Sequence, residues 1–336
     1  MAILGKYLLF LGDAAELLEA KTASGLVDWR PEQCVGQWRL PSCKIDLGLE
    51  DMTFTQARAA GAETLVIGVA PFGGAIASGW IEPIVAALDV GLNVASGMHS
   101  RLGSVPAIAA AARAYGGALF DVRFACQDFP VGSGRKRTGW RLLMVGTDCA
   151  VGKKYTALAI ARDMAKRGMK ATFRASGQTG ILIAGQGVPI DAVVADFMAG
   201  AAECLSPDND PDHWDVIEGQ GSLFHPAFAG VALALLHGSQ PDAIVVCHTA
   251  RRTTLDGYPT FVLPDLAPCI DTNLQMARLT NPAVLCAGIS INTSGLPAEE
   301  RAGYLQGVSD RFQLPCFDPV ATGTDLLVES LARTFN

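Results

Sequence analysis

Hydrophobic and polar residues alternate in two different patterns along residues 64–123. Apolar runs such as TLVIGVA and ALFDVR have the length and composition of buried strands, whereas WIEPIVAALDVG and VPAIAAAARAYGG have the length of helices. Strands that alternate with helices in this order are typical of βαβ units on a parallel sheet. We therefore predict an open, Rossmann-like α/β sheet for an N-terminal domain over residues 1–130, with its first strand near the start of the chain.

The segment FACQDFPVGSGRKRTGW, residues 124–140, interrupts this pattern with proline, glycine and serine. Exposed polar segments of this kind are where domains usually join, and we place the domain boundary here. Arg135, Lys136 and Arg137 lie within it. They belong either to a solvated linker or to a group that reaches an anion bound at the loop that follows.

A second domain, residues 139–336, opens with a strand, a glycine-containing loop and a helix. The expected strands are RLLMV (141–145), KATFRAS (170–176), WDVIEG (214–219), AIVVCH (243–248), AVLCAGISIN (283–292) and LPCFDP (314–319). Helical patterns cover residues 153–168, 190–205 and 228–239. This alternation predicts a P-loop NTPase-like, doubly wound parallel sheet, whose ligand lies beyond the carboxyl ends of the strands.

The bulk composition favours a compact two-domain enzyme. The 336 residues suffice for two cores, and half of them are hydrophobic. The net charge of −7 argues against a nucleic-acid partner, because binding to a phosphate backbone requires a basic surface. No apolar stretch approaches the roughly 20 residues that span a bilayer, and we expect a cytoplasmic protein without a membrane partner.

Nine cysteines are scattered along the chain, mostly within apolar runs such as AIVVCH and AVLCAG. No CxxC pair or Cys/His cluster with zinc spacing occurs, so the sequence predicts buried reduced thiols and no metal site. Only Cys149 lies near probable chemistry. The apolar helix expected at residues 105–114 is a candidate interface for a homo-oligomer, and we expect a dimer.

The segment GTDCAVGKKYT, which begins at Gly146, follows an apolar strand and precedes a helix. In such a loop, glycines let backbone N–H groups converge on phosphate oxygens, and a lysine adds a point charge. The usual pattern GxxxxGK[ST] is met only if Thr147 replaces the first glycine. The predicted phosphate-binding residues are Gly146, Thr147, Asp148, Cys149, Ala150, Val151, Gly152, Lys153, Lys154 and Tyr155.

Lys154 occupies the position where a nucleotide-hydrolysing loop carries the hydroxyl that binds magnesium. A lysine ammonium has no lone pair for a metal ion, so magnesium-dependent phosphoryl transfer is disfavoured. Two adjacent lysines suit a ligand with several phosphates that is held without being cleaved there, and coenzyme A fits that description. The Thr156 hydroxyl, one turn further along, keeps a nucleotide with magnesium as an open alternative.

The segment DVIEGQGSLFHPAF places Glu218 at the end of a buried strand, beside the phosphate loop. Glu218, or secondly His225, could act as a general base toward an amine. Alternatively, Glu218 caps a helix or pairs with Lys153 or Lys154, and His225 is a structural hydrogen-bonding residue. The glycine-rich turn offers Gln220, Gly221 and Ser222 for substrate binding.

Further polar residues follow other predicted strands. RASGQTG supplies Arg174, Ser176, Gln178 and Thr179, a composition suited to recognition of a small polar ligand. Arg174 is either a carboxylate clamp or part of a surface ion pair. SGMHSRLG and CHTARR add His99, Arg101, His248, Arg251 and Arg252 as anion-site candidates.

These motifs together have a counterpart among known families. GTDxxVGK and EGQG are similar to segments of dethiobiotin synthetases. A closer similarity joins GTDCAVGKKYTA, RASGQTGILIAGQGVPIDAVVADFMAGAAE, DVIEGQGSLFHPAFAGVALALLHGSQPD, ISINTSGL, VIGVAPFGGAI and GLNVASGMHSRL. Over nearly the whole chain, these segments resemble a bacterial two-domain family, long of unknown function, that includes the DgcN-type D-glutamate N-acetyltransferases.

The resemblance implies transfer of an acetyl group from acetyl-CoA to the amino group of D-glutamate, in D-amino acid catabolism. It also implies that residues 146–155 hold coenzyme A. As a hypothesis, Glu218 or His225 deprotonates the amine, which attacks the thioester directly, while backbone N–H groups of GQGS or SGQTG stabilise the oxyanion. Arg174, with Arg101 or Arg251, would bind the carboxylates.

Two alternatives of other classes stay open at this point. The first is an ATP-dependent ligase or kinase of the dethiobiotin-synthetase type that acts on a small carboxylate, supported by GTDxxVGK and Thr156. The second is a non-catalytic sensor that binds a small molecule and a nucleotide.

Overall fold

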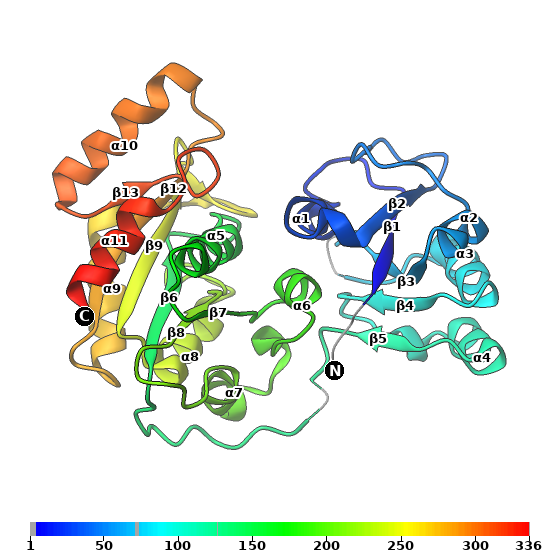
Figure 1. Cartoon of the computed structure of the whole chain (residues 1–336), viewed down its shortest axis with the longest axis horizontal. Coiled ribbons are helices and arrows are strands. Elements are labelled where there is room, and N and C mark those ends of the chain that lie inside the picture. The colour runs from blue at the N-terminus through cyan, green and yellow to red at the C-terminus, as the bar shows by residue number, and fades with distance from the viewer. Residues whose placement is uncertain (1–4, 71–73, 126, 336) are drawn as a thin grey trace. The chain divides into compact units, whose positions relative to one another are not determined.

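In the computed structural model, residues 5–70, 74–125 and 127–335 are described. They form two compact units. The first contains the described residues up to 125 together with 178–192, and the second contains 127–177 with 193–335. Each is an α/β unit built on a parallel sheet (Figure 1). Residues 71–73, within the segment VIGVAPFGGAI, and Cys126 lie outside the described residues.

The first unit has a five-stranded sheet in the order β2-β1-β3-β4-β5. All of its strand pairs are parallel, which confirms the predicted open α/β sheet. The strands are β1 (Lys6–Gly12), β2 (Cys34–Arg39), β3 (Ala62–Ile67), β4 (Asn93–Ser96) and β5 (Leu119–Asp121). The helices are α1 (Lys21–Trp29), α2 (Phe54–Ala59), α3 (Ser78–Asp89) and α4 (Pro106–Tyr115), with single 3-10 turns η1 (Pro31–Gln33) and η2 (Leu102–Ser104).

A short segment from later in the chain completes the first unit. Helix α6 (Gln178–Ala184) packs against α1, and the buried hydroxyls of Thr179 and Thr22 lie 3.1 Å apart. Arg30 Nε donates to the Ile183 carbonyl over 2.9 Å. Residues 178–192 lie between two strands of the second sheet in the chain, yet they make their contacts with the first unit.

The second unit has a six-stranded parallel sheet, as the sequence predicts. Its strand order is β13-β12-β9-β6-β8-β7. Its strands are β6 (Trp140–Gly146), β7 (Ala171–Arg174), β8 (Trp214–Ile217), β9 (Ala243–Thr249), β12 (Leu285–Asn292) and β13 (Cys316–Phe317). Strands β10 (Thr254–Leu255) and β11 (Tyr258–Val262) form a separate antiparallel hairpin. The helices are α5 (Lys153–Lys166), α7 (Met198–Leu205), α8 (Ala229–Ser239), α9 (Leu266–Arg278), α10 (Ala298–Phe312) and α11 (Asp325–Thr334).

One hydrophobic core of the second unit lies between its sheet and the helices α5 and α11. Leu142 and Val245 from the sheet pack there with Ile160 and Leu327 from these two helices, and all four side chains are fully buried. β6 lies between β9 and β8, so the loop that follows it begins at the middle of the sheet. In the described part of the chain, no helix is long and apolar enough to cross a membrane.

The helix predicted for residues 190–205 is wrong over its first half. The chain instead forms two 3-10 turns, η3 (Ile190–Ala192) and η4 (Ala195–Phe197), before α7 begins at Met198. The reason is tertiary, because the chain passes from the first unit to the second between residues 192 and 193. Val194 is extended there, with φ −58° and ψ 137°. Asp191 pairs with Arg123 in the first unit instead of facing a helical turn.

Arg135 and Lys136 are exposed, as the interpretation as a solvated linker expects, whereas Arg137 does not fit that interpretation. Arg137 is buried and donates to the carbonyls of Gly238 and Ser239, at the end of α8. Burial lowers its pKa to about 10. Arg135 pairs with Asp208, and Lys136 pairs with Asp242. These basic residues therefore fasten the segment to the second unit.

Candidate functional site

The predicted loop joins the central strand β6 to helix α5. Gly152 caps the helix with φ +98°, a left-handed conformation that favours glycine, and Ala150 also has a positive φ of 52°. A Cβ at Gly146 would lie 2.9 Å from the Cys247 carbonyl oxygen, so the strand end has no space for a side chain. The loop thus has the strand–loop–helix setting in which backbone N–H groups gather at a helix N-terminus.

Lys153 folds back over this loop. Its Nζ donates to the Asp148 carbonyl over 2.6 Å, and the side chain is only 7% exposed. Burial lowers the pKa of Lys153, although the nearby negative charges of Cys149, Cys247 and Asp148 oppose that effect. The Lys153 Nζ therefore sits at the loop, where it donates to one carbonyl oxygen that a phosphate oxygen could replace.

The Thr156 hydroxyl is already engaged inside the unit. Oγ1 donates to the Gly152 carbonyl over 3.0 Å and lies 2.8 Å from Ser290 Oγ, and the residue is fully buried. Lys154, half-buried with its Nζ 5.1 Å from the centre of the Tyr155 ring, holds the position where a magnesium-binding hydroxyl would stand. These residues do not fit a magnesium ion in the manner of nucleotide-hydrolysing loops.

Asp148 connects the loop to the segment after β9. Its fully buried carboxylate accepts from the backbone N–H of Cys149 over 2.6 Å and from that of Asp256 over 2.7 Å. Arg252 Nη1 lies 3.1 Å from Asp148 Oδ2 and donates to the Cys149 carbonyl over 2.9 Å. Asp148 therefore serves as an internal support of the loop.

Both Arg251 and Arg252 were anion-site candidates, and the sequence analysis gave only Arg251 a role in binding the carboxylates. Arg251 has a left-handed backbone, with φ +62°, and its Nη2 lies 2.5 Å from Glu300 Oε2 at the surface. Arg252 is the residue that reaches the loop. No signal in the sequence distinguishes the two adjacent arginines. The positive φ of Arg251 turns the two side chains in different directions, and this backbone conformation arises from tertiary packing. His248, the other candidate in this segment, has Nδ1 3.0 Å from Thr147 Oγ1, and burial lowers its pKa.

Glu218 is buried at the end of β8, as expected, and is 4% exposed. Its Oε2 accepts from the backbone N–H groups of Ser176 and Gly177, over 3.0 and 3.1 Å. Ser176 Oγ donates to the Glu218 carbonyl, and Gln220 Nε2 donates to Ser176 Oγ. The structure thus brings Ser176, Glu218 and Gln220 together. A Cβ at Gly219 would lie 3.0 Å from Lys153 Cδ, so the group borders the phosphate loop.

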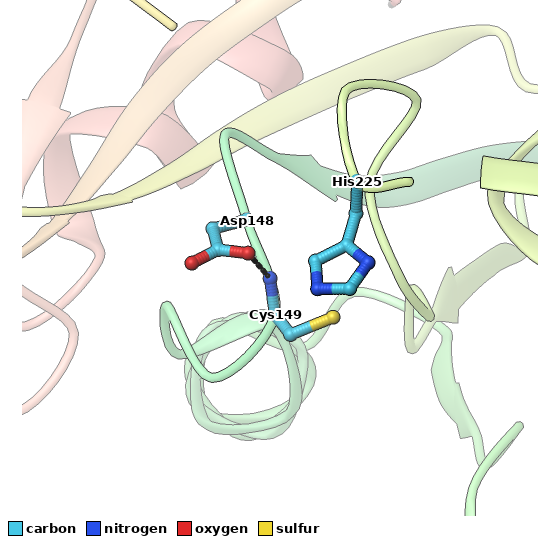
Figure 2. A group of neighbouring side chains, drawn as sticks. All are labelled: Asp148, Cys149 and His225. Atoms are coloured by element: carbon cyan, nitrogen blue, oxygen red, sulfur yellow. Dashed lines mark hydrogen bonds between the residues drawn. The ribbon is translucent and has the colours of Figure 1, made fainter. Parts of the chain in front are cut away.

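His225 is almost fully buried beside the loop, with its ring next to the Cys149 side chain (Figure 2). Nδ1 accepts from the Ala227 N–H over 3.2 Å, and Nε2 lies 3.4 Å from the Asp256 carbonyl oxygen. Acceptance at Nδ1 places the proton of the neutral ring on Nε2, which is then a donor rather than a base. Its ring stacks on Phe228 and meets Tyr258 edge-on.

Asp148, Cys149 and His225 present ligand-type atoms within 4.8 Å of one another (Figure 2). A metal ion would need lone pairs from these groups. Both oxygens of Asp148 already accept from backbone N–H groups, and so does Nδ1 of His225. The group therefore fits a hydrogen-bonded support better than a metal site.

The remaining candidates are divided between the two units. Arg174 pairs with the buried carboxylate of Asp215 over 2.7 Å, an interior ion pair rather than the surface pair considered from the sequence. Arg101, whose guanidinium lies 4.0 Å from the centre of the Phe124 ring, belongs to the first unit, as do Gln178 and Thr179. Ser222 Oγ accepts from the Phe224 N–H, and Gly221 adopts φ +60° in the same turn.

The sheet order, the loop after β6 and the helix that it caps define the second unit as a P-loop type α/β domain, joined to a Rossmann-like unit. The chain belongs to the DUF1611 family. The model described as a domain of unknown function, DUF1611_C P-loop domain, matches residues 130–328. The model described as DUF1611_N Rossmann-like domain matches residues 33–125.

Relatives over nearly the full length carry an activity in their names. A D-glutamate N-acetyltransferase from Tritonibacter scottomollicae is 53% identical over 326 residues, 97% of this chain and 98% of that protein. One from a Pseudoalteromonas species is 45% identical over 331 residues, 98% of this chain and 100% of that protein. The crystal structure of a DUF1611 family protein from Anabaena variabilis is 30% identical, with a TM-score of 0.88 over 98% of this chain and 100% of that chain.

Proposed function

We propose that this protein transfers the acetyl group of acetyl-CoA to the amino group of D-glutamate, giving N-acetyl-D-glutamate and free CoA. The observation that carries the proposal is the 53% and 45% identity, over nearly the whole chain, to two proteins named for that reaction. The loop chemistry supports it independently, because Lys153 and Lys154 suit phosphates that are held and not cleaved.

Residues 146–155 would hold the phosphates of CoA. Backbone N–H groups at the start of α5 would donate to the phosphates. A phosphate oxygen would replace the Asp148 carbonyl as the partner of the Lys153 ammonium. Lys154 would add a second positive charge. Arg252 and Asp148 would keep the loop in place without touching the ligand.

Glu218 is our candidate for the general base. It would take a proton from the ammonium group of D-glutamate, so that the neutral amine can attack the thioester carbon. The N–C bond forms and the C–S bond breaks. The departing sulfur takes the proton held by Glu218 and leaves as the CoA thiol, while the second ammonium proton passes to solvent. Because the phosphates and the thioester lie at opposite ends of the pantetheine arm, this assignment requires the arm to turn back along the sheet edge toward Glu218.

The backbone N–H groups of Ser176 and Gly177 donate to Glu218, so they are not the best oxyanion donors. We propose the turn at Gln220, Gly221 and Ser222 for that role. His225, with its proton on Nε2, is better placed to support the Asp256 segment than to act as a base.

For the carboxylates of the substrate we propose Arg174 together with Arg251, whereas the roles expected for Arg101, Gln178 and Thr179, which belong to the first unit, stay predictions. Arg174 and Arg251 now pair with Asp215 and Glu300 and would exchange these partners on binding. We further propose that the protein is cytoplasmic and works in D-amino acid catabolism. We also propose that it forms a homodimer with α4 at the interface, and sedimentation would measure the mass of this dimer.

The decisive experiment incubates the protein with acetyl-CoA and a panel of D- and L-amino acids while free thiol release is followed. We expect D-glutamate-dependent release of CoA and recovery of N-acetyl-D-glutamate. A parallel reaction contains ATP and magnesium without acetyl-CoA. Substrate-dependent cleavage of ATP in that reaction, with no thiol release in the first, would overturn the proposal in favour of a ligase or kinase.

A further inference from the structure

Four aromatic rings form a continuous series in which an inner ring, His225, lies beside the phosphate loop and both end rings reach the surface. Buried His225 stacks on Phe228, with 4.7 Å between ring centres and 26° between planes. His225 also meets Tyr258 edge-on at 4.9 Å, and Tyr258 meets Phe261 edge-on at 5.9 Å. We call these four side chains the aromatic series.

The two ends of the aromatic series are open to solvent. Phe228 is 49% exposed and Phe261 is 47% exposed, although phenylalanine is usually buried. Val262, next to Phe261 on the same strand, is 81% exposed. Apolar side chains that gather at the surface beside a polar site often mark a ligand-binding surface.

The aromatic series is joined to the loop by direct contacts. The Asp256 N–H donates to Asp148, and the Asp256 carbonyl faces His225 Nε2, so the turn of the β10–β11 hairpin contacts both the loop and the neighbouring His225. His225 also lies next to Cys149, within the loop itself (Figure 2). A ligand whose phosphates occupy the loop would therefore extend over rings that are held in a fixed relation to it.

We propose that the aromatic series binds the adenine ring of coenzyme A. The proposal rests on the acetyl-CoA dependence proposed above and adds the place of the adenosine end. CoA carries its adenine beside its phosphates, whereas the thioester is at the far end of the pantetheine arm. A cationic loop next to exposed rings matches that arrangement, with Lys153 and Lys154 facing the phosphates and an exposed ring stacking on the base.

The test compares two ligands on matched variants. CoA carries the adenosine end, and 4′-phosphopantetheine lacks it while keeping the arm and one phosphate. Dissociation constants for both are measured by calorimetry on wild-type protein, Phe228→Ala and Phe261→Ala. Phe197→Ala is the control, because it removes an exposed ring of the same unit that lies outside the aromatic series.

We expect at least one of the two variants to weaken CoA binding on the order of tenfold, as the loss of one stacked base predicts, while its binding of phosphopantetheine stays within about twofold of wild type. Phe261→Trp should restore the affinity for CoA at that position. The control should bind both ligands as wild type does. Melting temperatures and the mass in solution, measured on each variant, verify that the fold and assembly are unchanged.

Two results would overturn the inference while leaving acetyl transfer standing. One is wild-type protein that binds CoA no more tightly than phosphopantetheine. The other is that the two alanine variants lose affinity for both ligands equally or for neither. This includes the case in which the mass of the variants in solution changes because a second copy of the chain covers the rings. Wild-type protein that binds neither ligand, and releases no thiol from acetyl-CoA, would overturn the proposed function together with the inference.

Discussion

At the scale of single residues, three neighbouring side chains in the first turn of α5 differ in their burial and in their contacts. Lys153 is buried and folded onto a carbonyl, Lys154 is half-buried, and Thr156 has its hydroxyl engaged with Ser290. A phosphate can replace a carbonyl oxygen as the partner of an ammonium group at little cost. A magnesium ion would have to break the hydrogen bonds of Thr156 first.

Lys153 should make CoA binding depend on pH. Burial lowers its pKa below the usual value of about 10.4, so the free protein loses this ammonium at a lower pH than an ordinary lysine would. Bound phosphate requires the protonated form. The affinity for CoA should therefore fall as the pH rises through that lowered pKa. Binding should also be accompanied by uptake of a proton, which calorimetry in buffers of different ionisation enthalpy measures. Lys153→Arg should flatten the profile, and an unchanged slope would contradict this role.

Lys154 and Thr156 should respond differently to substitution. Lys154→Thr removes a charged donor, and CoA should bind about tenfold more weakly, since a hydrogen bond to a charged group is worth about 1.5–3 kcal/mol. Thr156→Val should leave CoA binding unchanged and lower the free energy of unfolding by about 1 kcal/mol. Binding is measured with and without magnesium. If Thr156→Val alone removed magnesium-dependent ATP binding, the magnesium argument would be wrong.

Glu218→Gln tests the proposed base. Glutamine keeps an oxygen that can accept from the Ser176 and Gly177 N–H groups, so the fold should persist. General-base catalysis commonly contributes about 10²–10⁴-fold, and we expect a loss in that range in the single-turnover rate with D-glutamate. CoA affinity and melting temperature should stay at the wild-type level. A chemical step within about threefold of wild type would exclude Glu218 as the base.

At the scale of elements, the ends of strands β12 and β13 are held together by hydrogen bonds to one side chain. β13 has two residues, and the carboxylate of Asp318 follows it directly. That carboxylate accepts from the N–H and the hydroxyl of Thr293 and from the N–H groups of Val320 and Ala321. One buried group therefore joins the ends of β12 and β13.

Asp318 should contribute to stability in a pH-dependent way. Burial by itself would raise its pKa, but the hydrogen bonds from Thr293, Ala321 and Val320 outweigh burial and hold the pKa below the usual value. A lowered carboxyl pKa stabilises the fold above the unfolded pKa of about 3.9, and that stability is lost as the pH falls through the folded value. Asp318→Asn should cost about 1–3 kcal/mol near neutral pH and less in acid, as urea unfolding at both pH values measures.

At the scale of the whole molecule, the two units differ from the two halves of the chain. Residues 178–192 follow a strand of the second sheet but pack with the first unit. These contacts join Thr22 to Thr179 and Arg30 to the Ile183 carbonyl. A cut at the linker would therefore leave the first unit without one of its packing elements.

A fragment of residues 1–126 should unfold at a lower temperature than the same fragment with residues 178–192 attached through a flexible Gly/Ser linker. Loss of α6 exposes the apolar surface of α1 and leaves Thr22 without its buried partner. Circular dichroism melting compares the two fragments. Thr179→Ala in the longer fragment serves as the control and should lower the melting temperature by a smaller amount. Equal melting temperatures for the two fragments would mean that α6 adds nothing to the first unit.

Much of the fold could be predicted from local pattern. The strands at 141–145 and 243–248 and the helix that begins at Lys153 are confirmed, because each has an apolar period and a clear boundary signal. The helix expected at 190–205 failed in its first half, since an apolar period gives no warning that the chain must change units there. The site was predicted less completely. Glu218 was placed correctly at its strand end, but the contacts of Arg252 were missed.

By itself, the sequence determined the six strands of the second sheet, the loop between Gly146 and Lys153, and the absence of a hydroxyl at position 154. These features depend on residue type and spacing over a few turns of chain. The tertiary structure alone decided that Thr156 is engaged, that Arg252 supports the loop, and that α6 completes the first unit. Each of these depends on contacts between residues that are distant in the chain, and only folding brings such residues together.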